Sequence, residues 1–169
     1  MMAADEGAAI LETNNDGPKI PDVKKTKFDV IIIGAGPSGY TAGIYCSRAG
    51  YDTLILSGIL PGGQLVDTTE VENYPGFENG IMGPDLMIDM RKQSQKMGTT
   101  IIDDVAVDVD FRRAPYKVLT GSEEYEGRAV IIATGANPRK MGISGEEEFS
   151  GKGVSYCATC DGPFFRNLE

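Results

Sequence analysis

The feature that most constrains the fold is a glycine-rich turn set between a short apolar run and a helical segment. Residues 28–33 form a β-branched run, which is typical of a strand buried on both faces of a parallel sheet. Residues 40–49 are expected to form a helix that Gly50 ends, and residues 51–57 a second strand. Together these segments predict a βαβ unit of about 30 residues, and therefore an α/β fold.

The turn itself carries the pattern G-x-G-x-x-G at Gly34, Gly36 and Gly39. In this pattern the first glycine permits the tight turn, the second lets the backbone approach a pyrophosphate, and the third lets helix and strand pack closely. The phosphates would lie at the helix N-terminus, where amide groups favour anions. Ser57 stands where an acidic residue is expected at the end of the second strand, which weakens a plain NAD interpretation and leaves FAD open.

The remaining segments extend the same fold class. The chain is expected to begin with a tail, because charges and prolines in this segment prevent regular structure. Further along, Leu86, Met90 and Met97 are expected to form the buried stripe of an amphipathic helix. The expected segments are a tail at 1–27, a long loop at 58–77, a helix at 82–97, one strand at 99–109, a small meander at 116–119 and 124–125, and a buried strand at 128–135.

A C-x-x-C pair, Cys157 and Cys160, lies near the end of the chain, with the carboxylate of Asp161 beside it. This spacing lets two sulfur atoms reach disulfide distance within one turn. Two interpretations stay open from the residues alone: a redox-active pair, or two ordinary buried cysteines. The third cysteine, Cys46, lies inside the first predicted helix and is expected to be a buried small hydrophobe.

The 169-residue chain has no histidine, which excludes Ser-His-Asp and Cys-His nucleophiles and histidine zinc sites. Zinc held by cysteines alone would need a second C-x-x-C, so no metal site is predicted. The net charge of −9 argues against nucleic acid or an anionic membrane as a partner. No segment approaches the roughly 20 apolar residues of a membrane span. Few cysteines and no visible signal peptide lead us to expect a cytoplasmic protein.

Five motifs, in order and spacing, resemble those of the low-molecular-weight thioredoxin reductases, and they lie at 36–42, 62–65, 69–76, 133–136 and 155–162. The resemblance covers about residues 28 to 167. It implies a Rossmann-like FAD-binding domain with a three-layer ββα arrangement, in which a parallel sheet carries a small β-meander. That domain, incomplete here, would span 28–137, and residues 138–169 would form a linker and the start of an NADPH and disulfide domain.

The resemblance also implies a set of FAD contacts. Residues 35–38 would face the pyrophosphate, residues 57–64 would wrap the adenosine ribose and phosphates, Asn73 would lie beside the isoalloxazine, and Ala106 would meet the adenine through its backbone. The complete set of expected contacts is Gly34, Ala35, Gly36, Pro37, Ser38, Gly39, Ser57, Gly58, Ile59, Leu60, Pro61, Gly62, Gly63, Gln64, Asn73, Ala106, Thr134, Gly135 and Cys160.

In such an enzyme electrons pass from NADPH through FAD to the cysteine pair and on to thioredoxin. The resemblance implies that Cys160 accepts electrons from the flavin, that Cys157 attacks thioredoxin, and that Asp161 is the acid/base. It also implies a homodimer. The second glycine-rich nucleotide motif of the family does not occur before Glu169, so most of the NADPH site is expected outside this chain, in a longer polypeptide or a second chain.

Two alternatives remain. One is a related flavoprotein that takes electrons from ferredoxin or reduced flavin, or passes them to a peroxidase partner. The other is an FAD-binding fragment without turnover.

Overall fold

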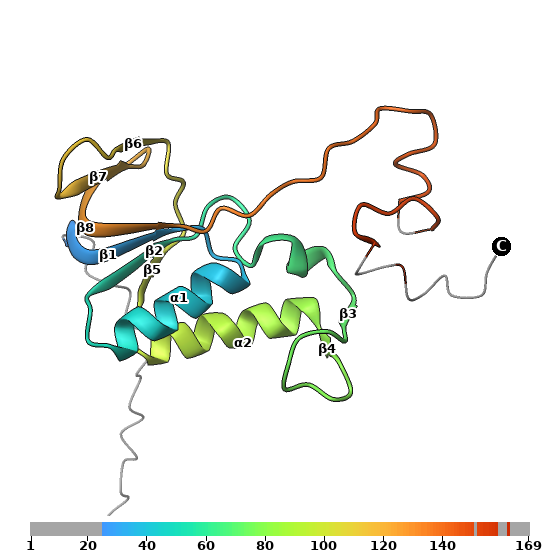
Figure 1. Cartoon of the computed structure of the whole chain (residues 1–169), viewed down its shortest axis with the longest axis horizontal. Coiled ribbons are helices and arrows are strands. Elements are labelled where there is room, and N and C mark those ends of the chain that lie inside the picture. The colour runs from blue at the N-terminus through green and yellow to red at the C-terminus, as the bar shows by residue number, and fades with distance from the viewer. Residues whose placement is uncertain (1–24, 151, 159–161, 163–169) are drawn as a thin grey trace, which may run out of the picture.

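A computed structural model describes residues 25–150, 152–158 and 162, and it is built around one mixed six-stranded sheet (Figure 1). The strand order is β5-β2-β1-β8-β7-β6. Four strands are mutually parallel, namely β5 (Thr100–Ile102), β2 (Thr53–Leu56), β1 (Lys27–Ile33) and β8 (Glu124–Ile132). Two antiparallel strands complete the sheet, β7 (Tyr116–Leu119) and β6 (Asp108–Asp110).

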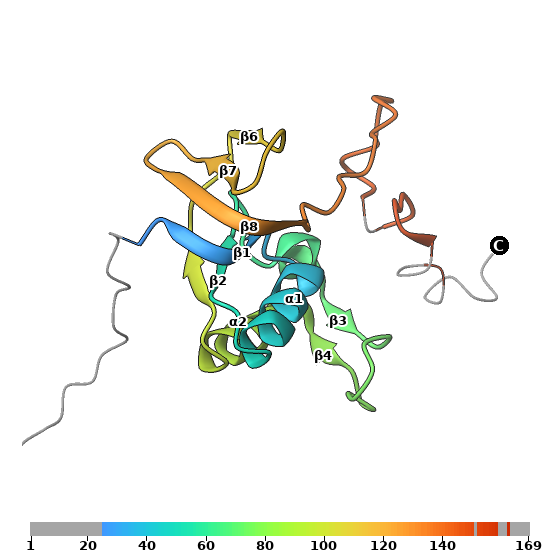
Figure 2. The ribbon, with the colours of Figure 1, turned by 60° about the vertical axis from the view of Figure 1, so that its left-hand side comes forward.

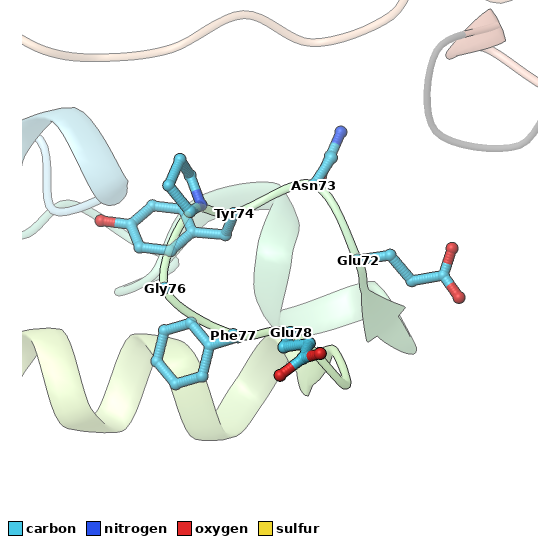
Figure 3. Close-up of a pocket in the computed structure, with 7 residues that line it drawn as sticks. Glu72, Asn73, Tyr74, Gly76, Phe77 and Glu78 are labelled. Carbon is cyan, nitrogen blue, oxygen red and sulfur yellow. The ribbon is translucent and has the colours of Figure 1, made fainter.

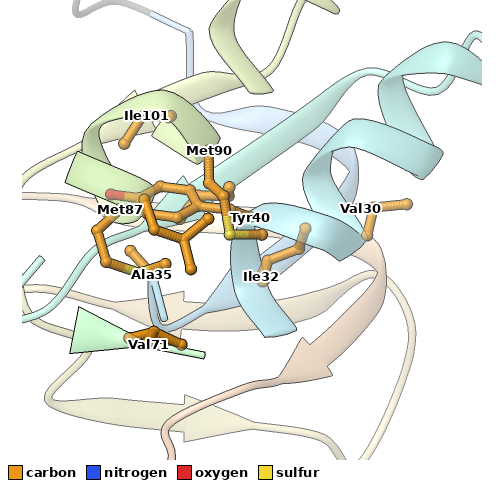
Figure 4. Packing of buried hydrophobic residues seen from close by; sticks show 10 residues of the cluster. Val30, Ile32, Ala35, Tyr40, Val71, Met87, Met90 and Ile101 are labelled. Carbon is orange, nitrogen blue, oxygen red and sulfur yellow. The ribbon is translucent and has the colours of Figure 1, made fainter. Parts of the chain in front are cut away.

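Two helices, α1 (Pro37–Arg48) and α2 (Gly83–Lys96), cover one face of the parallel strands (Figures 1 and 2). Alternate strand residues such as Ile32 and Ile55 point toward them, as the two-residue repeat of a strand requires. Figure 4 shows the resulting core. Its buried members are Val30, Ile32, Ala35, Tyr40, Ile55, Val71, Leu86, Met87, Met90 and Ile101.

The opposite face of the parallel strands is covered by the meander. Leu54 and Leu56 of β2 and Ile31 of β1 form a second buried cluster with Val118 of β7 and Tyr125 of β8. Helices, parallel sheet and meander therefore make three layers, which confirms the predicted α/β class with a parallel sheet and a small β-meander.

A short 3₁₀ helix and a two-stranded ribbon interrupt the expected long loop. They are η1 (Gly63–Asp67), β3 (Glu70–Val71) and β4 (Ile81–Met82), and β3 pairs antiparallel with β4. The stretch 58–77, predicted as a loop, therefore contains the regular elements η1 and β3. None of the helices in the described part of the chain is long and apolar enough to cross a membrane.

The prediction of one strand over 99–109 was wrong. Its two ends belong to β5 and β6, which lie at opposite edges of the sheet. Beyond Ile102, Asp104 accepts the N–H of Val105, which takes that backbone donor out of the sheet, and it also accepts the hydroxyl of Ser122. The preceding carboxylate, Asp103, binds Arg91 and Ser57.

The separation of 124–125 from 128–135 was also wrong, because β8 is a single strand of nine residues. Most of its length pairs with β1, and its first half also pairs with β7. Gly127 lies in the part of β8 that pairs with both β1 and β7. A Cβ at this position would come within 2.9 Å of the Ile31 side chain.

Helix boundaries differ by a few residues. The first helix begins at Pro37, three residues earlier than expected, because the fixed φ of proline suits the first helical position. In the second helix Leu86 and Met90 are buried as predicted, and Met87 is buried with them. Met97 follows this helix as its C-cap and is only partly buried.

Candidate functional site

A cavity of about 670 Å³ opens at the carboxyl ends of β1, β2 and β8, next to the N-terminus of α1. In open α/β sheets this edge is where ligands bind. The cavity is lined by Ile33, Gly34, Ala35, Gly36, Pro37, Ser38, Leu56, Ser57, Gly58, Ile59, Leu60, Gly63, Gln64, Leu65, Val105, Ala106, Ala133, Thr134, Gly135, Ala136 and Asn137.

The three glycines of the motif are required for different reasons. Gly34 has a φ of +109°, and a Cβ there would lie 2.2 Å from the carbonyl oxygen of Ala133. A Cβ on Gly39 would lie 2.0 Å from the carbonyl oxygen of Gly34, so this glycine lets α1 approach the turn. Gly36 has an ordinary φ of −81°, and a Cβ added to it would meet no protein atom within 4 Å. It lines the cavity, and its missing side chain leaves that part of the wall open to a ligand.

The N-terminus of α1 is free to receive an anion. Gly36 is the N-cap and supplies no side-chain cap, Pro37 occupies the start, and no acidic residue lies in the first turn. The amide groups of that turn and the helix dipole therefore present positive partial charge to the cavity. This arrangement suits a phosphate or pyrophosphate group.

The segment after β2 forms the opposite wall. The N–H of Gly62 donates to the carbonyl oxygen of Ala35 at 2.8 Å, which ties this wall to the glycine turn. The side-chain amide of Gln64 donates to the carbonyl oxygen of Ala136 and joins the wall to the chain after β8. Ile59 is 88% exposed, which leaves an apolar surface beside the opening for the flat part of a ligand.

Ser57, the residue predicted to contact the ribose, lines the cavity, and its side chain is hydrogen-bonded to Asp103. Its hydroxyl donates to Asp103 at 2.8 Å, and Arg91 donates twice to the same carboxylate, at 2.9 Å each. The Arg91 guanidinium holds the pKa of Asp103 below its ordinary value, so the carboxylate stays ionised at neutral pH.

Most of the predicted FAD contacts come together in this cavity. Fourteen of them line it: Gly34, Ala35, Gly36, Pro37, Ser38, Ser57, Gly58, Ile59, Leu60, Gly63, Gln64, Ala106, Thr134 and Gly135. Gly39, Pro61 and Gly62 are not in the lining, and Gly39 and Gly62 are instead positions where a Cβ would meet neighbouring protein atoms.

Seven further lining residues were not predicted, namely Ile33, Leu56, Leu65, Val105, Ala133, Ala136 and Asn137. Ile33 and Leu56 are the last residues of their strands, and Ala133 directly follows β8. The rule that ligands bind at the carboxyl ends of parallel strands would have indicated these three positions from the sequence.

Asn73 lies in a different hollow, of about 450 Å³, formed by residues 72–78 (Figure 3). The rings of Tyr74 and Phe77 lie on one side of this loop with their centroids 6.1 Å apart, and Asn73 points away from them. The structure therefore does not bring Asn73 into the larger cavity. Its predicted flavin contact stays a prediction.

Cys157 is partly buried and disulfide-bonded, and its N–H donates to the hydroxyl of Ser155 at 3.1 Å. It does not line the larger cavity. The other two residues predicted for catalysis, Cys160 and Asp161, lie outside the described residues. The third cysteine, Cys46, was expected to be buried but is only partly buried, packed against the core on the helix side of the sheet. It is a free thiol, and desolvation raises its pKa.

The segment before Cys157 is organised by one carboxylate. Glu146 is only 3% exposed and accepts hydrogen bonds from the backbone N–H groups of residues 141–143 and from the hydroxyl of Tyr156, the last at 2.5 Å. The Tyr156 hydroxyl and these amides lower the pKa of Glu146 to about 2. The residue next to Cys157 is thus hydrogen-bonded to a side chain ten positions earlier in the chain.

Glu146→Gln is expected to loosen this turn, because an amide offers one acceptor oxygen where the carboxylate offers two. Amide hydrogen exchange at residues 141–143 should accelerate roughly fivefold to tenfold at neutral pH. In the unchanged protein the folded pKa of Glu146 lies below its ordinary value of 4.5, so protection should be complete above that pH and decline as pH falls toward 2.

Glu147→Gln is the matched control, because the Glu147 side chain is exposed and forms an ion pair with Lys140 on the surface. Exchange at residues 141–143 should not respond to it. Equal acceleration in both variants would contradict the assignment of the turn to Glu146.

The chain is similar to known proteins over most of its length. The sequence profile of the pyridine nucleotide-disulphide oxidoreductases matches residues 28–169. The chain is 53% identical to a thioredoxin reductase of Rickettsia bellii over 86% of this chain and 47% of the relative. It is 54% identical to a thioredoxin reductase of Listeria monocytogenes over 84% of this chain and 44% of the relative. The chain therefore spans about half the length of these curated relatives.

Solved structures show the same likeness. The crystal structure of thioredoxin reductase from Streptococcus pyogenes superposes with a TM-score of 0.76 at 41% identity, covering 83% of this chain and 46% of that one. Since the family profile matches residues 28–169, well over half of the sequence, the chain belongs to the pyridine nucleotide-disulphide oxidoreductase family.

Proposed function

We propose that the protein carrying this chain is a thioredoxin-disulfide reductase that binds FAD and takes electrons from NADPH. The observation that carries the proposal is the cavity at the carboxyl ends of β1, β2 and β8, with the uncapped N-terminus of α1 at one side. The thioredoxin reductases among its relatives, about half identical over the shared part, support the substrate.

The cavity fits a dinucleotide on the evidence of its own residues. The missing side chain of Gly36 leaves room in front of the α1 amides, where a pyrophosphate would be held. The apolar surface of Ile59 and Leu60 would cover flat ring systems. Bound FAD would supply two-electron transfer between a nicotinamide and a disulfide.

The cysteine pair would carry out the exchange with thioredoxin. Cys157, as a thiolate, attacks one sulfur of the thioredoxin disulfide, which breaks that bond and forms a mixed disulfide. The Cys160 thiolate then attacks the Cys157 sulfur, so that the Cys157–Cys160 disulfide forms and thioredoxin leaves as a dithiol. Two electrons pass to thioredoxin, and its two departing thiolates take up one proton from Asp161 and one from solvent.

Anaerobic titration of the full-length protein with NADPH tests the proposal. Flavin absorbance should bleach, and two thiols should become titratable as NADPH is added. A purified full-length protein that binds no flavin would overturn the proposal. A flavoprotein that NADPH leaves oxidised, but that ferredoxin or reduced flavin reduces, would favour the related electron path instead.

The homodimer and the cytoplasmic location stay predictions. Sedimentation of the full-length protein and fractionation of its source cells would test them separately.

A further inference from the structure

A carboxylate reaches the end of β2 from the neighbouring strand. β5 runs parallel to β2 with Leu56 opposite Ile102, so Ser57 and Asp103 follow these strands at the same level. The Ser57 hydroxyl donates to Asp103 Oδ1 at 2.8 Å. The acidic group that dinucleotide-binding folds place at the end of the second strand is therefore present in space, although it is absent from that strand in the sequence.

Arg91, from α2, fixes this carboxylate. Its two terminal nitrogens donate to Oδ1 and Oδ2 of Asp103 at 2.9 Å each, in the two-pronged geometry that suits a guanidinium and a carboxylate. Ser57 itself is 3% exposed but contributes to the cavity wall. The three side chains thus connect helix α2 with the cavity through β5 and β2.

The hydrogen-bond donors of Ser57 and Gly58 are all used inside the protein. A serine hydroxyl has one proton and two lone pairs, and Asp103 takes the proton of Ser57. The N–H of Ser57 donates to the carbonyl oxygen of Ile102, and the N–H of Gly58 donates to that of Asp104, each at 3.0 Å. Ser57 and Gly58 therefore offer acceptors and no donors to a ligand.

Two parts of the cavity lining differ in chemistry as a result. The first turn of α1 presents donors and suits an anion, whereas the lining at Ser57 and Gly58 presents acceptors, with a carboxylate behind Ser57. A ligand group beside Ser57 must donate a hydrogen bond, and an added phosphate there would meet the acceptor atoms of Ser57 and Gly58. A ribose with free hydroxyls meets this requirement.

We propose that Asp103, held by Arg91, is a positioning residue that makes Ser57 a hydrogen-bond acceptor. In this role Asp103 selects an unphosphorylated adenosine ribose beside Ser57 in the cavity. The inference rests on the proposed binding of FAD. It identifies which part of the cavity distinguishes a plain adenosine ribose from a phosphorylated one.

The test compares three ligands on the flavin-free full-length protein: FAD, FAD carrying 2′,3′-dideoxyadenosine, and FAD phosphorylated at the adenosine 2′-hydroxyl. The unchanged protein should bind FAD about fivefold to tenfold more tightly than the dideoxy ligand, and at least about tenfold more tightly than the phosphorylated one. Ser57→Ala should remove the preference over the dideoxy ligand.

Asp103→Ala should reduce the ratio of FAD affinity to phosphorylated-FAD affinity at least about fivefold. The reason is that Ser57 regains a proton to donate and Arg91 loses its counter-charge. Asp103→Asn keeps the shape of the side chain without its charge and should act in the same direction. Asp104→Asn is the control, because the Asp104 carboxylate binds Ser122 and the N–H of Val105, and both preferences should persist.

A general loss of stability would weaken all three ligands alike and would not change these ratios. An unchanged ratio of FAD to phosphorylated FAD in both Asp103 variants would overturn the inference while leaving the proposed function intact. An unchanged protein that binds none of the three ligands would overturn both.

Discussion

Cys157→Ser is expected to abolish thioredoxin reduction and to leave FAD bound. A serine hydroxyl is protonated at neutral pH and cannot form the mixed disulfide, so turnover should fall by about 10³-fold or more. Flavin content should stay unchanged, because Cys157 does not line the cavity in which we place the cofactor. Turnover with thioredoxin and flavin absorbance per chain, measured on the same preparation of full-length protein, give both quantities.

Cys46→Ser is the matched control. Cys46 lies in α1 as a free thiol, and burial raises its pKa, which keeps it protonated and unreactive. Turnover should change little. Loss of flavin in Cys157→Ser, or retention of turnover, would argue against the role proposed for Cys157.

Gly36→Ser is expected to separate stability from cofactor binding. Gly36 is the N-cap of α1 with φ −81° and ψ −172°, a conformation that serine adopts readily, and serine is a better N-cap than glycine. The melting temperature should therefore hold or rise. FAD binding should weaken, because the new side chain fills the space in front of the α1 amides and its oxygen competes for them.

The expected loss follows from overfilling a close contact, which typically costs about 1–3 kcal/mol. That range corresponds to a dissociation constant about 5- to 150-fold higher, measurable by fluorescence titration of the flavin-free full-length protein.

Two other glycines serve as controls. Gly121 lies in the turn between β7 and β8 with nothing within 4 Å of an added Cβ, so Gly121→Ser should affect neither stability nor FAD binding. Gly39→Ala should lower stability, because its Cβ would come within 2.0 Å of the Gly34 carbonyl oxygen. FAD affinity unchanged in Gly36→Ser would contradict the placement of the pyrophosphate.

The βαβ unit was predictable because its signals are local. A β-branched run, three glycines and a second apolar run fix β1, α1 and β2 without help from distant residues. The cavity residues were predicted through the family resemblance instead. Ala106, Thr134 and Gly135 line the same cavity as the glycine motif, although they lie far from it in the sequence.

The meander was harder to predict because its outcome depends on partners far along the chain. Between β5 and β6, Asp103 binds Arg91 and Ser57, and neither contact is visible from the alternation of apolar residues over 99–109. The unbroken course of β8 depends on Gly127 facing Ile31, a residue nearly a hundred positions earlier. Likewise, periodicity gives no sign that the Glu146 carboxylate accepts hydrogen bonds from the N–H groups of residues 141–143.

The double pairing of β8 has a mechanical consequence. One continuous strand hydrogen-bonds to β7 through its first half and ends at Ile132, directly before the wall made by Ala133 and Thr134. The meander cannot detach or tilt without straining the strand that leads into this wall. The meander and the wall made by Ala133 and Thr134 should therefore unfold locally as one cooperative unit. A ligand bound in the cavity should then also protect the meander strands at the edge of the sheet against local unfolding.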